Sequence, residues 1–251
     1  TLFMTLRTGL SEMVEAVQEK SLNLNFKTDV KVLSVERSNS GDPNWRVALQ
    51  NGGSMNADAV ILAPPAHVTA KLISGFAPKA ADELNKIVYV STAAVTLAFR
   101  KEGFKHPLNG FGFLAPKSEG TDIMACTWTS TKFPQRAPED HVLLRCYIGG
   151  ALRENLAEQD TEALTNMTRK DLKSIMGIDN EPVFNKVFIN RKANVQYHVG
   201  HADRIDRIES ELEKFPGIYL AGSAYKGIGI PDCIASGTSS AESALNRLSG
   251  K

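Results

Sequence analysis

The sequence has few cysteines and no excess of charge of either sign. Its 251 residues include three cysteines, and 29 basic residues stand against 28 acidic ones, for a formal net charge of +1. Cys126, Cys146 and Cys233 are odd in number, widely spaced and outside any CxxC pair. That pattern indicates reduced thiols rather than a disulfide framework or a zinc site. The balanced charge gives no global signal for a nucleic acid or an anionic membrane as partner.

Long apolar runs are also missing. No run reaches the roughly 18 apolar residues of a membrane-spanning helix, and the first residues lack the basic-then-apolar pattern of a secretory leader. With 42% hydrophobic and 23% charged residues, the composition is typical of a soluble globular protein. We therefore expect a cytoplasmic protein of one large or two small domains, at most peripheral to a membrane.

The first part of the chain has the pattern of an α/β domain. Apolar residues recur at helical spacing over 10–17. A β-branched run over 29–36, turn residues at 40–44 and the Asn51-Gly52 dipeptide then predict a short strand meander. Residues 58–65, DAVILAPP, form a nearly continuous apolar run that ends in two prolines. Such a run is typical of a strand that is buried on both faces.

The middle of the chain, residues 66–215, has a different pattern. Apolar periodicity predicts a short helix at APKAADELNKI and two amphipathic helices, one over 160–177 that Gly177 closes and one over 202–215. The stretch 182–190, PVFNKVFIN, is a strand candidate between them. Four further β-rich runs predict an antiparallel sheet, and they are STAAVTLAFR, GFGFLAP, DIMACTWTS and HVLLRCYIGG.

The end of the chain returns to the α/β pattern. A short apolar strand at 217–222, a glycine-rich loop and a helix over 234–248 follow one another. In that order they form the usual half of a nucleotide-binding α/β unit. We therefore predict a partial Rossmann-like domain built from 1–65 and 216–251, with 66–215 inserted as a β-rich domain. The predicted fold class is α/β and α+β.

The glycines of the last loop and helix have two interpretations. Gly222, Gly227, Gly229 and Gly237 remove side chains along one path, and Asp232 is placed to cap the helix that follows. A helix start offers unpaired N–H groups and a partial positive charge, which suit a pyrophosphate or an electron-rich ring carbonyl. Alternatively, the glycines serve only turns and the close packing of strand against helix.

The string LAGSAYKGIGIPDCIASG, residues 220–237, resembles the C-terminal flavin-contact motif of oxygen-dependent porphyrinogen oxidases. These enzymes are members of the amine-oxidase-like flavoprotein superfamily. ACTWTSTKFPQRAPEDHVLLR and QYHVGH resemble segments of the family's substrate domain, and TLRTGLSEMVEAV resembles the helix before its adenine-contacting strand. The resemblance runs across the whole chain, is closest to the soluble Gram-positive type, and implies the C-terminal half of such an enzyme.

The activity that the resemblance implies is the FAD-dependent oxidation of a porphyrinogen, coproporphyrinogen III or protoporphyrinogen IX, to the porphyrin in haem biosynthesis. O2 is the acceptor and hydrogen peroxide the second product. Because the flavin carries the redox chemistry, the protein mainly has to orient a large, flat, acidic substrate. We therefore assign no catalytic acid or base.

The cofactor contacts follow from the resemblance position by position. The backbone of Val30 matches the adenine contact, and Gly222 with Ser223 matches the residues beside the pyrophosphate and ribityl chain. The helix start matches the residues beneath the pyrimidine edge of the flavin, where a helix N-terminus stabilises negative charge. The implied FAD-binding residues are Val30, Gly222, Ser223, Gly229, Ile230, Pro231, Asp232 and Gly237.

Candidate substrate residues lie in the middle segment. Trp128 and Phe133 could line a porphyrin pocket, although aromatic residues within a strand pattern are more often core residues. Arg145, together with Lys132 and Arg136, could bind the carboxylates of the substrate, since a guanidinium group suits a carboxylate. The alternative for these charges is a solvated surface.

The sequence departs from the family pattern in two ways. No GxGxxG occurs in the 251 residues, so the main pyrophosphate loop is missing. Ile189, Asn190 and Val195 stand where the family has an Arg-Trp pair and a proline. His198 and His201 have no third ligand at a metal spacing, and we expect no metal site. We therefore predict that the chain alone binds FAD weakly or not at all.

Two other functions compete with this interpretation. One is a non-enzymatic fragment or paralogue that binds a porphyrin or a protein partner, including a second copy or the missing N-terminal half. The other is a different enzyme of the superfamily, an amine oxidase or a carotenoid desaturase, against which the IPDCIASG string argues.

Overall fold

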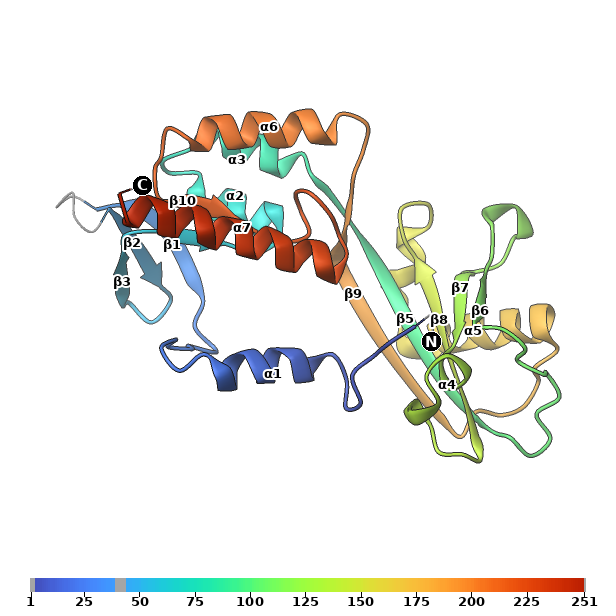
Figure 1. Ribbon diagram of the computed structural model, residues 1–251. Coiled ribbons are helices and arrows are strands. Elements are labelled where there is room, and N and C mark those ends of the chain that lie inside the picture. Colours follow the sequence, from blue (N-terminus) through green and yellow to red (C-terminus); the bar gives the residue numbers. More distant parts are fainter. Residues whose placement is uncertain (1–2, 39–43, 251) are drawn as a thin grey trace. The chain divides into compact units, whose positions relative to one another are not determined.

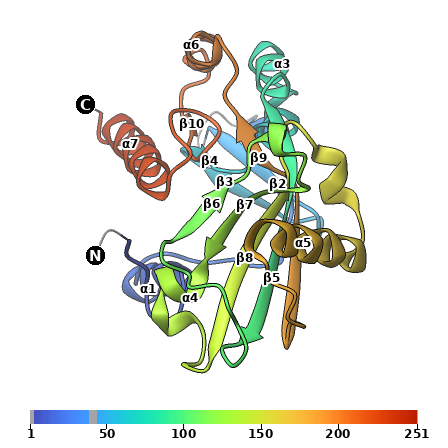
Figure 2. The ribbon, with the colours of Figure 1, turned by 90° about the vertical axis from the view of Figure 1, so that its right-hand side faces the viewer.

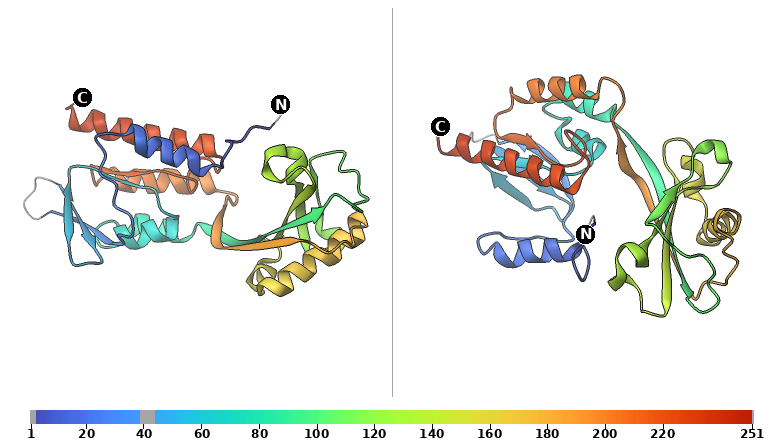
Figure 3. Two further views of the ribbon diagram at one scale, coloured as in Figure 1. Left: turned by 90° about the horizontal axis from the view of Figure 1, so that it is seen from below. Right: turned by 45° about the vertical axis from the view of Figure 1, so that its right-hand side comes forward.

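The computed structural model describes residues 3–38 and 44–250 and divides the chain into two compact units (Figure 1). Unit 1 comprises Thr1–Phe26 and Val90–Asn194, and unit 2 comprises Lys27–Tyr89 and Val195–Lys251. The chain therefore crosses three times between the units. Two of these crossings lie near the ends of the long strands β5 (Val88–Arg100) and β9 (Phe184–Gln196), whose course Figure 3 shows.

Unit 1 is built around a five-stranded sheet in the order β6-β7-β8-β5-β9. Strand β8 pairs antiparallel with both β5 and β7, and β7 pairs antiparallel with β6. The remaining elements of unit 1 are α1 (Ser11–Lys20), β6 (Gly112–Leu114), η1 (Lys117–Glu119), β7 (Ile123–Trp128), α4 (Thr129–Lys132), η2 (Pro134–Arg136), β8 (His141–Gly149), η3 (Glu154–Glu158) and α5 (Thr161–Met176).

Helix α5 covers one face of this sheet (Figure 2). The alternating residues Ala93, Val95, Leu97 and Phe99 of β5 are buried in one core with Leu164 and Leu172 of α5. The carboxylate of Asp160 accepts a hydrogen bond from the Ala163 amide (2.8 Å) at the start of α5, and Gly177 ends the helix with a φ of 67°. The predicted helix and its glycine cap are confirmed.

In its described residues, unit 2 combines two small sheets with four helices. Strands β1 (Val32–Arg37), β2 (Trp45–Leu49) and β3 (Ser54–Ala57) form the antiparallel meander that the sequence predicts. Strands β4 (Val60–Leu62) and β10 (Ile218–Leu220) form a separate parallel pair. The helices of unit 2 are α2 (Ala66–Ile73), α3 (Pro78–Asn85), α6 (His201–Leu212) and α7 (Ile230–Leu248).

The core of unit 2 joins the meander to helices α2, α3 and α6. Trp45 is fully buried, and its indole N–H donates to the Pro216 carbonyl (3.2 Å). Its ring lies 4.7 Å from that of Phe76, which in turn lies 5.2 Å from that of Phe215. Aromatic contacts thus connect the meander to the segment that enters β10.

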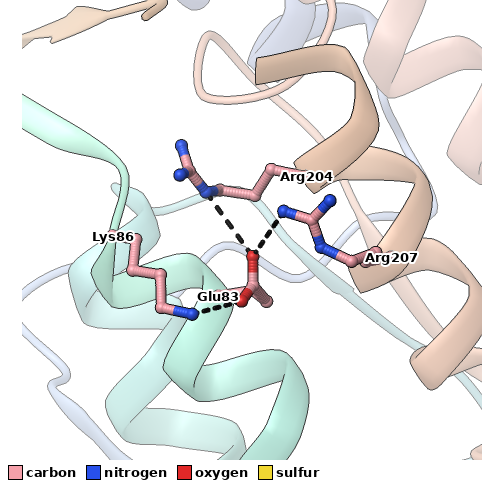
Figure 4. Close-up of polar contacts among 4 residues, drawn as sticks. All are labelled: Glu83, Lys86, Arg204 and Arg207. Atoms are coloured by element: carbon pink, nitrogen blue, oxygen red, sulfur yellow. Dashed lines mark hydrogen bonds and ion pairs between the residues drawn. The ribbon is translucent and has the colours of Figure 1, made fainter. Parts of the chain in front are cut away.

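Ion pairs on the surface of unit 2 tie α3 to α6. Glu83 of α3 binds Arg204 (3.6 Å) and Arg207 (3.0 Å) of α6, and also Lys86 of its own helix end (Figure 4). The hydrogen bond from Lys86, followed by that from Arg207, lowers the pKa of the Glu83 carboxyl. The carboxylate is therefore ionised at neutral pH and holds the two helices at one point.

The structure sets the division of the chain at different residues from the predicted domains. Helices α2, α3 and α6 lie within the predicted insertion, but their apolar faces are buried in the core that β1, β2 and β10 also line. The first 26 residues, by contrast, group with the central sheet. Arg136 is one reason, because its guanidinium donates to Thr5 Oγ1 (2.9 Å) and to the Leu6 carbonyl (2.8 Å). Which unit serves FAD and which serves the substrate stays a prediction.

Three local expectations differ from the structure. The apolar run 58–65 yields only the short strand β4, where Ile61 is 40% exposed, so the prediction of burial on both faces is wrong. A sheet of two strands cannot enclose such a strand. The last helix begins at Ile230, earlier than predicted, because Pro231 is tolerated in a first turn. The turn predicted at 40–44 lies largely outside the described residues.

Candidate cofactor site

The candidate site is the loop between β10 and α7 in unit 2 (Figure 1). It contains Gly222, whose φ of 109° is unfavourable for other residues and whose amide donates to Ser236 Oγ of α7 (3.2 Å). At Gly227 an added Cβ would lie 2.5 Å from Asp232, so the backbone passes too close to that side chain for any larger residue. Both glycines therefore shape the loop itself.

Helix α7 starts with the predicted cap. Asp232 Oδ2 accepts a hydrogen bond from the Gly229 amide (3.0 Å), and a Cβ at Gly229 would lie 2.9 Å from the same oxygen. Pro231 has no amide hydrogen, so the first turn presents the amides of Ile230 and Asp232 at the positive end of the helix dipole. The side chains of Ile230, Pro231 and Asp232 are exposed. The helix start is thus open to a ligand.

Gly237 differs from the other three glycines. It lies within α7, and a Cβ added there would meet no atom within 4 Å among the described residues. A glycine inside a helix costs about 0.5–1 kcal/mol relative to alanine. No contact in the described chain requires this glycine, so its role in cofactor binding stays a prediction.

Val30 lies in the same unit, two residues before β1. It is 37% exposed, and the residue before it, Asp29, has a φ of 57°. A left-handed conformation is unusual for a residue with a side chain and often marks a functional segment. The backbone at Val30 is therefore held in a specific course.

Two residues that the sequence did not single out as cofactor residues contact the glycine loop. Tyr197 Oη donates to the Ser223 carbonyl (2.8 Å) and accepts from the Gly227 amide (3.0 Å). His201 Nε2 lies 3.1 Å from the Tyr225 carbonyl. Burial raises the pKa of Tyr197, and it raises the pKa of Tyr225 to about 12, so both phenols stay protonated at neutral pH. Tyr197 and His201 both belong to the QYHVGH string, which is the sequence signal that could have identified them.

The candidate substrate residues all belong to unit 1. Trp128 ends β7 and is only 8% exposed, and its indole nitrogen is buried without a hydrogen-bond partner in the described residues. Its ring packs 5.2 Å from that of His106, so much of the side chain is core. Phe133 is half-buried just after α4, with the Lys132 ammonium 5.6 Å from its ring centre. Neither ring is fully free for a ligand.

Arg145 has a different setting. It is exposed in the middle of β8, where it pairs across the sheet with Thr96 of β5 and Thr127 of β7. The neighbouring row along the same face consists of Tyr147 between Ala94 and Ala125. This is the face opposite α5, because alternate residues of β5 point into the α5 core. Arg145 thus stands on this sheet face beside the small side chains of Ala94, Thr96, Ala125 and Thr127.

Comparison with known proteins decides the family. Residues 2–245 match the family described as flavin containing amine oxidoreductase. The chain belongs to this family. The predicted resemblance to porphyrinogen oxidases of the amine-oxidase-like superfamily, with FAD as cofactor, is thereby confirmed.

Relatives of the chain carry porphyrinogen oxidase names. The chain is 34% identical to coproporphyrinogen III oxidase of Bacillus subtilis (strain 168), over 98% of this chain and 52% of that protein. It is 28% identical to protoporphyrinogen oxidase 1 of Arabidopsis thaliana, over 91% and 44%. The crystal structure of a candidate protoporphyrinogen oxidase from Exiguobacterium sp. 255-15 matches with a TM-score of 0.85 and 32% identity, over 96% of this chain and 52% of that one. The chain spans about half the length of these relatives.

The mixed α/β fold with a partial FAD-binding part is confirmed by the same match. The residues of unit 2 fit the flavin of the family, because the open backbone at Gly237 and the amides at the start of α7 are both accessible. The departures from the family pattern have different settings: Asn190 is exposed on β9, whereas Val195 is 8% exposed in the core of unit 2. A valine at 195 thus serves packing.

The described residues offer neither a metal centre nor a membrane-spanning helix. Within 3–38 and 44–250, no three side chains of His, Cys, Asp or Glu come close enough together to hold a metal ion. In the same ranges, every helix is too short or too polar to cross a bilayer. His201 forms the first turn of α6, as expected for a polar residue at a helix entrance.

Proposed function

We propose that this chain is the C-terminal half of an FAD-dependent porphyrinogen oxidase of haem biosynthesis, which converts coproporphyrinogen III or protoporphyrinogen IX to the porphyrin with O2. The observation that carries the proposal is Gly237, which lies inside α7 and packs against no side chain in the described residues. The N-terminus of the same helix is exposed, and the chain belongs to a flavin-containing family. Relatives with about half their length in common are named for these two substrates.

The cofactor residues of this proposal are those of the glycine loop and α7, with Val30. Bound FAD supplies the redox chemistry, with O2 as final acceptor. The amides of Ile230 and Asp232 would help to hold the flavin and would stabilise negative charge on it. Gly222, Ser223 and Gly229 keep the loop narrow, and Gly237 lets the helix backbone come close. The chain thus orients the cofactor and transfers no proton itself.

Arg145 is the substrate residue that the structure supports best. An exposed guanidinium on a face of small side chains can bind a carboxylate while the flat tetrapyrrole lies along the sheet. Trp128 and Phe133 contribute apolar edges in this proposal. Lys132 is a weaker candidate because its ammonium lies 3.8 Å from the Phe3 ring centre, and Arg136 is held by the N-terminal segment.

The experiment uses the full-length protein supplied with FAD and coproporphyrinogen III or protoporphyrinogen IX in air. We expect porphyrin fluorescence to rise faster than in the protein-free autoxidation control. In Arg145→Gln we expect KM for coproporphyrinogen III to rise about tenfold, as for one lost charge-assisted hydrogen bond, with FAD content unchanged. Arg169→Gln is the matched control, since Arg169 lies on α5, which covers the other face of the sheet, and pairs with Glu181. Porphyrin formation no faster than autoxidation would refute the proposed function.

A second candidate function is a non-enzymatic module. The absence of GxGxxG in the 251 residues and the exposed Asn190 favour it for the chain by itself. Such a module would bind a porphyrin or a protein rather than FAD. The absorption spectrum of the purified chain after desalting separates the two, because bound oxidised flavin and bound porphyrin absorb in different visible bands. We expect little or no flavin in the 251-residue chain, and a stoichiometric flavin spectrum would contradict this.

Partners and location are part of the same proposal. The apolar side chains Ile234, Leu245 and Leu248 of α7 are each more than half exposed, as are Leu10, Val14 and Val17 around α1. We propose that the other half of the oxidase covers these faces, and that the chain alone self-associates through them. Sedimentation of the chain checks this, and a monomer at all concentrations would contradict self-association. The proposed location is the cytoplasm, with peripheral membrane contact left open.

A further inference from the structure

The glycine loop is held from one side by two stacked rings. Tyr197 and His201 lie at the turn between β9 and α6, with ring centres 3.9 Å apart and planes at 12°. Their polar atoms contact the backbone of three alternate loop residues, Ser223, Tyr225 and Gly227. The loop between the end of β10 and the start of α7 is therefore fastened at regular intervals.

The support beneath the two rings is rigid. His201 is the first residue of α6 and is 7% exposed, while Ile205, Ile208 and Leu212 of the same helix lie in the core of unit 2. Glu83 fastens α6 to α3 through Arg204 and Arg207 (Figure 4). The position of the rings is thus set by the core. The ends of the loop are bound to α7 through Gly222 and Gly229, and the two rings add contacts to the residues between them.

The chemistry of the contacts indicates more than general packing. His201 Nδ1 is buried without a hydrogen-bond partner among the described residues. Burying an unpaired nitrogen costs free energy, and the imidazole is nevertheless held where its other nitrogen contacts the loop. Tyr197, in contrast, is 41% exposed, and its hydroxyl bonds only loop backbone in the contacts described above. The partly exposed Tyr197 hydroxyl therefore contributes little to core packing, and its role is to hold the loop backbone.

We infer that Tyr197 and His201 are positioning residues for the flavin: they do not contact it, but they set the loop conformation that receives it. This inference rests on the proposed function. With the hydroxyl of Tyr197 in place, the Ser223 carbonyl and the Gly227 amide are both bound to one side chain. The backbone between residues 223 and 227 is thereby held at two points, four residues apart, directly before the start of α7.

The test is Tyr197→Phe in the full-length protein, which keeps the ring stacked on His201 and removes only the two hydrogen bonds. Losing them and leaving the Gly227 amide without its partner should weaken FAD binding about tenfold to a hundredfold. The FAD dissociation constant is measured by flavin fluorescence on titrating the flavin-free protein. Tyr219→Phe is the matched control, since Tyr219 lies in the same unit and its hydroxyl donates to Ser243 (3.3 Å), outside the loop. We expect it to bind FAD within about twofold of the wild type.

A second readout separates positioning from general stability. In the flavin-free protein, amide hydrogen exchange of residues 222–229 should accelerate about tenfold in Tyr197→Phe while the rest of unit 2 exchanges as in Tyr219→Phe. Unchanged FAD affinity in Tyr197→Phe overturns the inference, as does exchange that accelerates throughout unit 2. If the wild-type protein itself binds no FAD, the proposed function fails together with the inference. If the wild type binds FAD and forms porphyrin while Tyr197→Phe behaves like the control, the inference alone fails.

Discussion

The two units differ in how far they cover their own apolar surface. Unit 1 buries one face of a five-stranded sheet beneath α5, with Leu97, Phe99, Leu144 and Leu164 almost fully enclosed. Unit 2 has a meander and a parallel pair of only two strands, and its last helix leaves apolar side chains exposed. Parallel strands are normally found in larger sheets covered on both faces. Unit 1 thus covers one face of its sheet with α5, although Leu10, Val14 and Val17 around α1 are more than half exposed. In unit 2 the apolar side chains Ile234, Leu245 and Leu248 of α7 are more than half exposed.

The largest effect that tests this difference is a cavity in the core of unit 1. Phe99→Ala should lower the free energy of unfolding by about 3–5 kcal/mol, because the Phe99 ring is 1% exposed. The two tryptophans, one in each unit, allow urea unfolding of both units to be followed by fluorescence. We expect the change to appear in the signal of Trp128 and to leave that of Trp45 largely unaffected. Phe188→Ala, at an exposed site of β9, is the control. If Phe99→Ala shifted the unfolding transitions of both tryptophans equally, the two units would not have separate cores.

A smaller effect concerns the open helix of unit 2. Gly237→Ala should stabilise the flavin-free protein by about 0.5–1 kcal/mol through helix propensity, since the new methyl group meets no atom. The same change should weaken FAD binding, because a methyl group would stand between the helix and the cofactor. Thermal melting without flavin and FAD titration measure the two effects. Gly227→Ala, where the methyl group would meet Asp232, should destabilise instead. Loss of stability in Gly237→Ala would show that the glycine has an internal role.

The smallest expected effect is at the surface link between α3 and α6. The pKa of Glu83 is lowered in the folded state, so its contribution to stability is present above the ordinary carboxyl pKa and disappears as the pH falls through the folded value. Glu83→Gln should therefore cost about 1 kcal/mol at neutral pH and nothing in acid below that range. Urea unfolding at several pH values checks this, with Glu36→Gln as a control at the longer, more exposed contact with Arg46. If the stability difference between Glu83→Gln and the wild type did not depend on pH, the charge of Glu83 would not be the source of its contribution to stability.

The sequence predicted elements well where a local signal set their ends. Asp160 and Gly177 mark the limits of α5, and the periodicity of Ile205, Ile208 and Leu212 marks the buried face of α6. The sequence predicted less well which apolar faces of helices and strands are covered by other elements. The apolar run around Ile61 and the apolar face of α7 both look like buried surfaces, because periodicity shows that a face is apolar but not whether a partner lies against it.

The sequence predicted where the candidate site lies, but not which contacts each of its residues makes. The four glycines looked equivalent in the sequence, and only the backbone course separates Gly227, which Asp232 requires, from Gly237, which nothing in the described chain requires. Tyr197 and His201 were missed as loop supports because their partners, Ser223, Tyr225 and Gly227, lie 24 to 30 positions away. Contacts over such a separation depend on how α6 packs, which no local pattern encodes.

The three crossings of the chain between the units limit how the molecule can be taken apart. Neither unit is a continuous stretch of sequence, so no single backbone cleavage releases one of them whole, and no simple truncation expresses either alone. A gene fragment that ended within β5 or β9 would remove part of both. Each unit therefore depends on both of its chain segments, and separating the units takes a cut in the backbone at each of the three crossings.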